Sequence, residues 1–487
     1  MKKFTVLTLI AISIFAINGC KKDYFDLSAN PNASSTATPA LVLTNAMATT
    51  GTFPIINFQA QSAWLGYWSP SGSYAVSATD AASYAQTTGY GDGLWRSVYD
   101  NLEDYNFVEK EATKTGSTFY IAAAKVMKAY DYQILVDVFN NVPYTEALQG
   151  TTNLLPKYDK GQFIYEDLAK QLDAAIVLFQ RSDAIGDGAS DIMFAGDNTQ
   201  WIKFANTLKL RLLIHQTQIS GRTQYIQTEI SKIVANGGGF LTTDAAVNPG
   251  YSASTGKQNP FWNLNYNTSG IYIGDYWKAN KYAIDFGLAN NDTNRLNRLY
   301  TKIGGVFVGG RLGSTNNPVG GKISNFGPGV LKSVAQPSIL ISAAESYFLQ
   351  AEAAFRTLLP GNVQTYFNAG VQASFDYLGA TGAVDYYSQA NNKSTNYAAA
   401  TSPTEQLSVI IRQKWVANNT VMPLEAYNDY RRLGLPSDIP ISVSTFADVS
   451  SIPTRFLYPT VEYSTNAANV GAEGNINHHT SKIFWMP

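Results

Sequence analysis

The chain has 487 residues, of which 45% are hydrophobic, so it is long and apolar enough to bury a sizeable core. Its 35 Lys and Arg residues balance 36 Asp and Glu residues, which leaves a formal net charge of -1. Such a chain has no net field that attracts phosphate, so we expect no nucleic-acid partner. Aromatic residues reach 13%, more than a core of this size requires, and we expect some rings to face a ligand.

The first segment has the features of a lipoprotein signal peptide. Lys2 and Lys3 precede an apolar stretch over residues 4–17, and Cys20, the only cysteine, follows it. The stretch is shorter than the roughly 20 residues of a membrane-spanning helix, so residues 1–19 are predicted to be a cleaved signal peptide. Cys20 then becomes the acylated N-terminus that anchors the protein. The alternative is a secreted protein whose signal peptide carries a stray thiol.

The remainder is predicted to be a tether followed by one domain. Residues 20–52 are assigned to the lipidated N-terminus and the tether, because Ser, Thr, Asn, Ala and Pro dominate from residue 28 onward. Residues 53–487 are predicted to form a single domain, in which apolar residues at spacings of three and four are typical of helices with one buried face. The clearest such segments are residues 119–134, 168–179, 201–212, 342–355, 366–377, 406–418 and 423–433.

Local signals mark several helix ends. Asn198 or Thr199 is a suitable N-cap for the helix around residues 201–212. Ser342 and Glu345 have the spacing of a capping box, and Gly434 is placed to end the helix before it. These helices come in neighbouring pairs along the chain.

Residues 237–329 differ from the helical segments. Gly, Asn, Ser and aromatic residues dominate there, charges are sparse, and any strands must be short. A long irregular segment in a compact protein is commonly functional, and its many Trp and Tyr residues argue against disorder. We therefore predict a loop-rich, aromatic-rich lobe at about residues 237–329.

The ordered motifs of the mature chain resemble those of the SusD/RagB family from end to end. Two departures are Ser28, where the family usually has Asn, and Asn140-Asn141, which replace Gly-Asp. The matching segments are residues 26–32, 137–148, 196–211, 345–353, 425–432 and 455–462. Within the last two segments, we expect Asp429, Arg431, Arg432 and Glu462 to form buried ion pairs rather than a catalytic centre.

This resemblance implies a mainly α fold, a tetratricopeptide-like superhelix of helical pairs carrying the loop-rich lobe. It also implies a lipid-anchored protein on the surface of the bacterial outer membrane. Members of the family capture oligosaccharides or peptides and deliver them to a TonB-dependent transporter of the SusC/RagA type. The expected partners are therefore this transporter, the ligand and the membrane, and the protein is not expected to be an enzyme.

Two aromatic clusters are candidates for ligand binding, because flat rings flanked by amides and hydroxyls suit both sugars and peptides. We favour the cluster in the loop-rich lobe over the cluster nearer the N-terminus, although any single ring could instead belong to the core. The favoured cluster consists of Trp262, Asn263, Tyr266, Tyr272, Asp275, Tyr276 and Trp277. The other cluster consists of Trp64, Tyr67, Trp68 and Tyr74.

Other functions remain open at this point. A glycoside hydrolase needs two carboxylates about 5–10 Å apart in a cleft, which a sequence cannot exclude. An adhesin, or a subunit that only gates the transporter, is a third possibility. No cofactor is expected, and three His residues offer little scope for a metal site.

Overall fold

The computed structural model describes residues 37–75, 78–447 and 451–487. The folded unit is Pro39–Pro487, so the predicted signal peptide and Cys20 lie outside the described residues. Among the described helices, none is both long enough and apolar enough to span a membrane.

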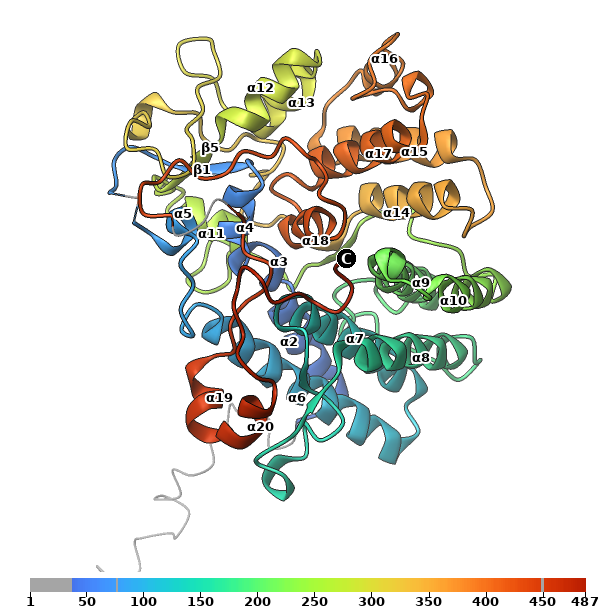
Figure 1. The fold of residues 1–487 in the computed structure, drawn as a ribbon. Coiled ribbons are helices and arrows are strands. Elements are labelled where there is room, and N and C mark those ends of the chain that lie inside the picture. The colour runs from blue at the N-terminus through green and yellow to red at the C-terminus, as the bar shows by residue number, and fades with distance from the viewer. Residues whose placement is uncertain (1–36, 76–77, 448–450) are drawn as a thin grey trace, which may run out of the picture. The chain divides into compact units, whose positions relative to one another are not determined.

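Most of the folded unit is an array of long antiparallel helices (Figure 1). Neighbours along the array pack directly: α6 on α7, α7 on α8, α8 on α9, α9 on α14, and α14 on both α15 and α17. The predicted mainly α fold of stacked helical pairs is confirmed. The array consists of α6 (Asp92–Thr115), α7 (Thr118–Phe139), α8 (Gly161–Phe179), α9 (Asn198–His215), α10 (Thr223–Ala235), α14 (Ala343–Phe355), α15 (Val363–Leu378), α17 (Pro403–Asn418) and α18 (Pro423–Leu433).

The helix ends follow the capping chemistry of the sequence, with two differences. The Glu345 side chain binds Arg211, so the predicted capping box with Ser342 is only half formed, and α9 has another N-cap than expected. The Ser342 hydroxyl accepts a hydrogen bond from the Glu345 backbone N–H, and Gly434 ends α18 in the left-handed conformation at φ 65°. The N-cap of α9, however, is Asp197, whose carboxylate accepts from the first backbone N–H groups of the helix. Asp197 is the N-cap instead of the expected Asn198, because its extended backbone directs the carboxylate toward the helix N-terminus.

The predicted tether, residues 20–52, includes residues that belong to the folded unit. Residues 39–50 form helix α2, whose buried side chains include Leu43, Ala46 and Met47, and it packs on α6 and α7. Leu43, Ala46 and Met47 stand at positions i, i+3 and i+4, which lie on one face of a helix. All three belong to the main core. The boundary of the folded unit therefore lies at Pro39, and residues 39–52 are not part of a tether.

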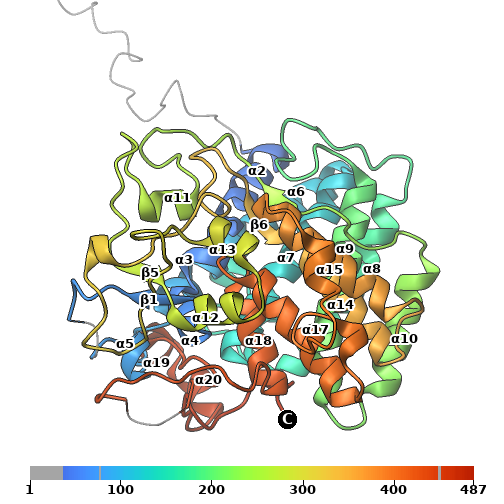
Figure 2. The same ribbon diagram turned by 90° about the horizontal axis from the view of Figure 1, so that it is seen from above.

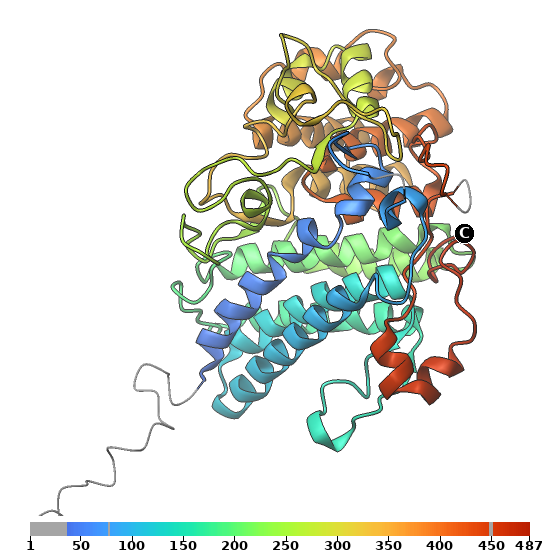
Figure 3. The same ribbon diagram turned by 90° about the vertical axis from the view of Figure 1, so that its left-hand side faces the viewer.

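Residues 237–329 contain short elements joined by long loops, and we call this segment the aromatic lobe (Figures 2 and 3). Its strand β5 pairs antiparallel with β1, so that Pro70 lies opposite Trp277 and Trp68 lies opposite Ala279. This pairing joins the lobe to a segment about two hundred residues earlier in the chain. The elements of the lobe are β4 (Ala245–Val247), α11 (Pro260–Asn265), β5 (Trp277–Ala279), α12 (Lys281–Ala289), α13 (Thr293–Leu299) and η5 (Gly320–Lys322).

Short elements complete the fold around these two parts. β4 pairs antiparallel with β6, which ties the lobe to the start of α14, and β2 pairs with β3 between α7 and α8. The short elements are α3 (Phe53–Ile56), α4 (Gln59–Trp64), β1 (Trp68–Pro70), α5 (Asp80–Ser83), β2 (Val142–Pro143), η3 (Gly150–Thr152), β3 (Tyr158–Asp159), η4 (Gln216–Gln218), β6 (Ser338–Ile341), α16 (Ala383–Tyr387), η6 (Tyr397–Ala399), α19 (Thr460–Thr465) and α20 (Ala467–Ala472).

Candidate ligand-binding site

Three of the four residues in the N-terminal aromatic cluster belong to the core, so their prediction as ligand contacts is wrong. Trp64, Tyr67 and Trp68 are all 0% exposed. Their polar atoms are also satisfied inside the protein: the Trp64 indole N–H donates to the Ala81 carbonyl, and the Trp68 indole N–H donates to the Thr420 hydroxyl. The neighbouring Gln61, Ser62 and Ser69 are buried as well.

The fourth residue of that cluster, Tyr74, joins the favoured cluster instead. Tyr74 is 45% exposed, and its ring packs edge-on against Tyr276 with centroids 5.1 Å apart. Tyr276 packs in the same manner against Trp277 at 4.8 Å. The Trp277 indole N–H donates to Gln59 Oε1 over 2.7 Å, which fixes the orientation of this ring. Tyr74, Tyr276 and Trp277 therefore form one continuous group of half-buried or exposed rings.

A second group of rings lies on α11 and the loop after it. Trp262 stacks on Tyr266 with centroids 4.3 Å apart and an angle of 19° between the rings. Tyr272 packs edge-on against Tyr266 at 5.3 Å, and the two residues form an isolated β-bridge. Asn263, one residue after Trp262, is exposed. Offset and edge-on ring contacts of this kind stabilise a preformed surface.

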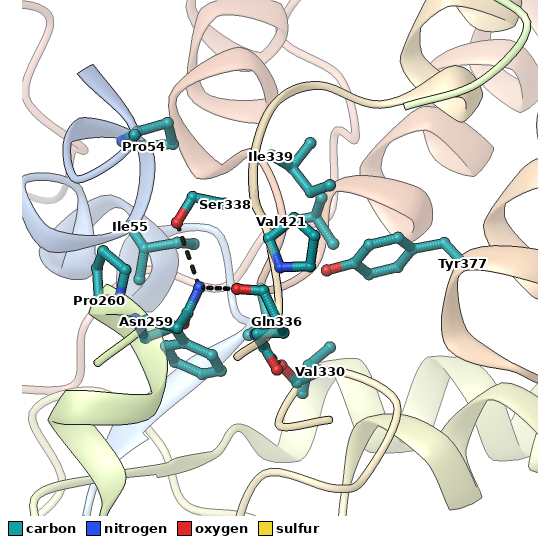
Figure 4. A pocket seen from close by; sticks show the side chains of 14 residues that line it. Pro54, Ile55, Asn259, Pro260, Val330, Gln336, Ser338, Ile339, Tyr377 and Val421 are labelled. Atoms are coloured by element: carbon teal, nitrogen blue, oxygen red, sulfur yellow. Dashed lines mark hydrogen bonds between the residues drawn. The ribbon is translucent and has the colours of Figure 1, made fainter. Parts of the chain in front are cut away.

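The N-terminus of α11 is held rigidly, which fixes the position of Trp262 (Figure 4). The Asn259 side-chain carbonyl accepts from the Phe261 and Trp262 backbone N–H groups, and its amide donates to the Gln336 carbonyl and the Ser338 hydroxyl. The cavity beside these groups has a volume of about 30 Å³. That volume holds about one water molecule, so the cavity is a small gap between packed elements and not a ligand pocket.

Both ring groups rest on the same buried layer. Trp68 contacts Trp277 at 5.9 Å and Phe261 at 5.8 Å, and Phe326 contacts both Trp68 and Phe261. This layer occupies the left side of Figure 1, where β1, β5 and α11 lie together. We call the two ring groups together the aromatic surface, defined by Tyr74, Trp262, Tyr266, Tyr272, Tyr276 and Trp277.

The charged residues of the lobe add little net charge to this surface. Lys278 is buried, its ammonium group donates to the Gly274 carbonyl and Asn325 Oδ1, and it lies 5.0 Å from the Tyr272 ring centroid. Burial lowers the pKa of Lys278, although Asp275 opposes this effect from 3.4 Å. The Asp275 side chain is 44% exposed, so it is available as a hydrogen-bond acceptor for a hydroxyl or amide.

Two exposed apolar residues of the lobe were not anticipated. Ile271 is 61% exposed and Ile273 is 53% exposed, on either side of Tyr272. The alternating Ile-Tyr-Ile pattern predicts one buried face, but the segment is a surface loop and leaves both Ile side chains in solvent. They enlarge the apolar area beside the rings.

Asp137, His215 and Glu425 lie close enough to hold a metal ion, but their hydrogen bonds are those of a structural network. One ligand atom of each residue lies within 4.8 Å of the others. His215 Nε2 is 3.0 Å from Glu425 and His215 Nδ1 is 3.1 Å from the Tyr165 hydroxyl, so both ring nitrogens are engaged. Burial opposes protonation of this ring, yet the two carboxylates outweigh it and raise the His215 pKa to about 9. A metal ion bound here would therefore have to displace the proton from the His215 ring.

The charged residues of the family motifs form buried ion pairs around this trio. Arg211 binds Glu345 with two hydrogen bonds of 2.8 and 2.9 Å, and Arg432 binds Glu352 with bonds of 2.6 and 2.7 Å. Asp429 pairs with Arg432, which confirms the expected buried pairing of these two motif residues. Glu462 instead accepts a hydrogen bond from the Tyr158 hydroxyl. Such a network specifies helix packing and leaves no substrate access.

The fold is an array of helical pairs that carries a lobe with a group of half-buried and exposed aromatic rings. A model of SusD-like proteins, described as starch-binding and associating with the outer membrane, matches residues 31–459. The chain therefore belongs to the SusD-like family. The description of this family names starch binding, which places the protein among binding proteins and not among enzymes.

Solved structures share the fold over almost the whole chain. A chitin-binding protein is 26% identical, with a TM-score of 0.76 over 92% of this chain and 100% of its own. A SusD-like protein from Bacteroides thetaiotaomicron is 23% identical, with a TM-score of 0.77 over 92% and 98% of the two chains. A chitin-binding SusD homolog from Flavobacterium johnsoniae is 21% identical, with a TM-score of 0.75 over 91% and 98%. No curated protein matches this chain.

Proposed function

We propose that this protein captures oligosaccharides on its aromatic surface at the outside of the outer membrane. The observation that carries the proposal is the preformed stack of Trp262 on Tyr266, with ring centroids 4.3 Å apart. Sugar rings present apolar C–H faces to aromatic rings and hydroxyl edges to amides and carboxylates. The family description as starch-binding, and the chitin-binding protein at 26% identity, support a glycan rather than a peptide.

Calorimetric titration tests this proposal. The protein from residue 21 onward is titrated with malto-oligosaccharides, chito-oligosaccharides and mixed peptides, and each sample is analysed for hydrolysis products. We expect one glycan class to bind without product formation, with moderate affinity because ordering of ligand and side chains offsets much of the ring burial. Trp262→Ala is expected to weaken binding at least tenfold, whereas Tyr463→Ala, which removes a 42% exposed ring outside the lobe, leaves it unchanged. Binding of peptides alone contradicts the proposal.

The second part of the proposal is that the protein delivers the captured glycan to a transporter. A lipid anchor on Cys20 holds the protein at the membrane, and a TonB-dependent transporter of the SusC/RagA type receives the glycan. The family's association with the outer membrane supports this role. We expect Cys20→Ala to release the protein from the membrane fraction, and we expect the wild-type protein to co-purify from detergent-solubilised membranes with a barrel transporter. If the wild-type protein purifies from these membranes without a barrel transporter, the delivery step is contradicted.

A further inference from the structure

A second cavity lies where the start of α12, at the top of Figure 1, meets a segment that follows α18. Its volume is about 230 Å³, and residues from 280–285, 311–312 and 440–443 line it together with Ala63. None of the six rings of the aromatic surface lines this cavity, so it is a separate feature of the protein. A dry cavity of about 150 Å³ is enough for benzene, so this one can take an aromatic ring or a short alkyl chain that carries a small polar group.

Residues 441–444 present apolar side chains to this cavity and bury polar ones. Ile441 is 44% exposed and Val443 is 51% exposed, and both line the cavity. Ser442 and Ser444, which alternate with them, are only 8% and 9% exposed. A surface segment ordinarily turns its apolar residues inward and its polar residues toward water. The reversed pattern leaves an apolar wall open to whatever enters the cavity.

Contacts on the inner side of this segment fix the reversed pattern. The Val443 backbone N–H donates to the Leu312 carbonyl over 3.0 Å. Gly313 has a φ of 77°, and a Cβ on it would lie 2.3 Å from Ser442 Oγ and 2.8 Å from Ser444 Cβ. Glycine therefore leaves the room that the two serines occupy. A shift by one residue would turn every side chain of the segment to the other face, so this packing holds the apolar side chains at the cavity.

Tyr282 adds an aromatic wall whose position is also fixed. Its hydroxyl accepts from the Arg412 guanidinium over 2.6 Å and donates to the Asp438 carboxylate over 2.9 Å. Its ring packs edge-on against Trp415 with centroids 5.3 Å apart. The Asn280 side chain accepts from the Tyr282 backbone N–H over 2.9 Å. The cavity is therefore formed before any ligand enters it, as is usual for small-molecule sites.

The charged residues of the cavity leave one positive charge in excess. The Lys281 ammonium donates to both oxygens of Asp285, over 2.7 and 2.8 Å, so these two charges compensate each other. Arg311 is exposed, and in the part of the chain that the structure describes its guanidinium has neither an ion pair nor a hydrogen bond. A guanidinium offers five N–H donors in a fork that matches a carboxylate. An apolar cavity beside such a group favours a ligand with an anionic end.

We propose that this cavity binds a small carboxylic acid whose apolar part has the size of one aromatic ring or a short alkyl chain. The apolar part lies against Ile441, Val443 and Tyr282, and the carboxylate binds Arg311. A sugar fits less well, because its hydroxyl groups would lose water against the apolar wall without gaining partners there. An amine fits less well because Arg311 repels it. The site is independent of the proposed glycan capture on the aromatic surface.

The test uses the protein from residue 21 onward, with phenylpropionate and hexanoate as the acids. Phenylpropanol and hexanol are their neutral counterparts, and phenylpropylamine is the cationic one. Binding is measured by saturation-transfer NMR and calorimetry. We expect at least one acid to bind saturably with a Kd of about 1 mM, which suits a ligand of this size. Its alcohol is expected to bind about fivefold more weakly, because the charge-assisted hydrogen bonds to Arg311 are lost, and the amine more weakly still.

Two variants at exposed positions of the wall separate the two parts of the site. Arg311→Gln is expected to weaken binding of the acid about fivefold and to leave binding of the alcohol unchanged. Val443→Ser is expected to weaken acid and alcohol alike, by about fivefold, because it removes apolar surface from the wall. Phe446→Ser is the matched control for Val443: Phe446 is 58% exposed on the same segment but does not line the cavity, so binding must stay unchanged.

The remaining outcomes decide the proposal. Trp262→Ala must leave acid binding intact, because Trp262 belongs to the aromatic surface and does not line this cavity. A loss of acid binding in that variant would place the acid on the aromatic surface and overturn the proposal. The proposal is also overturned if neither acid binds saturably, if the alcohol or the amine binds as tightly as the acid, or if Arg311→Gln and Val443→Ser both bind the acid as the wild type does.

Discussion

The Thr50 hydroxyl at the end of α2 donates to the Asp131 carboxylate in the middle of α7, with an Oγ1–Oδ1 distance of 3.2 Å. Asn101 of α6 donates to the same carboxylate over 2.8 Å. Asp131 is 0% exposed, and no cation pairs with it among the described residues. Burial therefore raises the Asp131 pKa to about 8, against the opposing effect of the two hydrogen bonds.

This raised pKa makes the docking of α2 sensitive to pH. The folded state binds the Asp131 proton more tightly than the unfolded state does. The stability that this proton contributes is therefore complete below about pH 4 and is lost as the pH rises to about 8. Asp131→Asn keeps the shape and removes the charge, so we expect it to stabilise the protein by a few kcal/mol near pH 8 and by little near pH 4. Denaturant unfolding at several pH values measures this, and an unchanged pH profile contradicts it.

His215 is predicted to stabilise the protein through its charge. Its pKa is raised to about 9 in the folded state, against about 6.5 unfolded, so its contribution is complete below about pH 6.5 and is lost between there and about pH 9. His215→Gln leaves Glu425 and Asp137 without this cation, and we expect a loss of about 3–5 kcal/mol at neutral pH. NMR titration of the ring tests the pKa itself.

Two tryptophans of the lobe region should respond differently to removal. Trp68 is fully buried between Trp277, Phe261 and Phe326, so Trp68→Ala is expected to cost about 3–5 kcal/mol of unfolding free energy. Trp262 is only half-buried, so Trp262→Ala should cost clearly less and act mainly on ligand binding. Thermal unfolding measured beside glycan titration separates the two effects. Equal destabilisation by both variants contradicts the assignment of Trp262 to the surface.

Gln59 is predicted to position a ring rather than to stabilise the fold. Its Oε1 accepts from the Trp277 indole N–H, the contact that orients Trp277 beside Tyr276. We expect Gln59→Ala to weaken oligosaccharide binding a few-fold, because Trp277 becomes free to turn, with a stability change of about 1 kcal/mol or less. Gln59→Glu, which keeps an acceptor, should restore most of the binding in calorimetry. Failure of this rescue indicates that Trp277 is not a ligand contact.

Asn140 occupies the place where the SusD-like motif usually has Gly. Its φ of 71° and ψ of -92° are strained for a residue with a side chain, yet its Oδ1 accepts from the Phe484 backbone N–H over 2.7 Å. Asn140→Ala keeps the strain and loses this bond, so we expect a loss of about 1–3 kcal/mol. Asn140→Gly loses the bond but relieves the strain and should cost less. Denaturant midpoints rank the two variants, and the reverse order contradicts this account.

Local features of the chain determined the helices and the family. The 3.6-residue periodicity of α8, the Ser342–Glu345 spacing and Gly434 act within one or two turns, so each can be read without knowing what packs on it. The ordered motifs gave the family for a related reason. Two residues of these motifs, Arg211 and Glu345, bind one another across helices.

Only the tertiary structure decided which aromatic residues face solvent and where the folded unit begins. Trp68 and Trp277 have similar neighbours in sequence, but β1 and β5 pair so that Trp68 points into the layer with Phe326 while Trp277 stays half-exposed. Helix α2 is apolar but has no clear amphipathic pattern, and it is buried because it packs on α6 and α7. Burial depends on contacts between segments hundreds of residues apart, and no local pattern encodes these contacts.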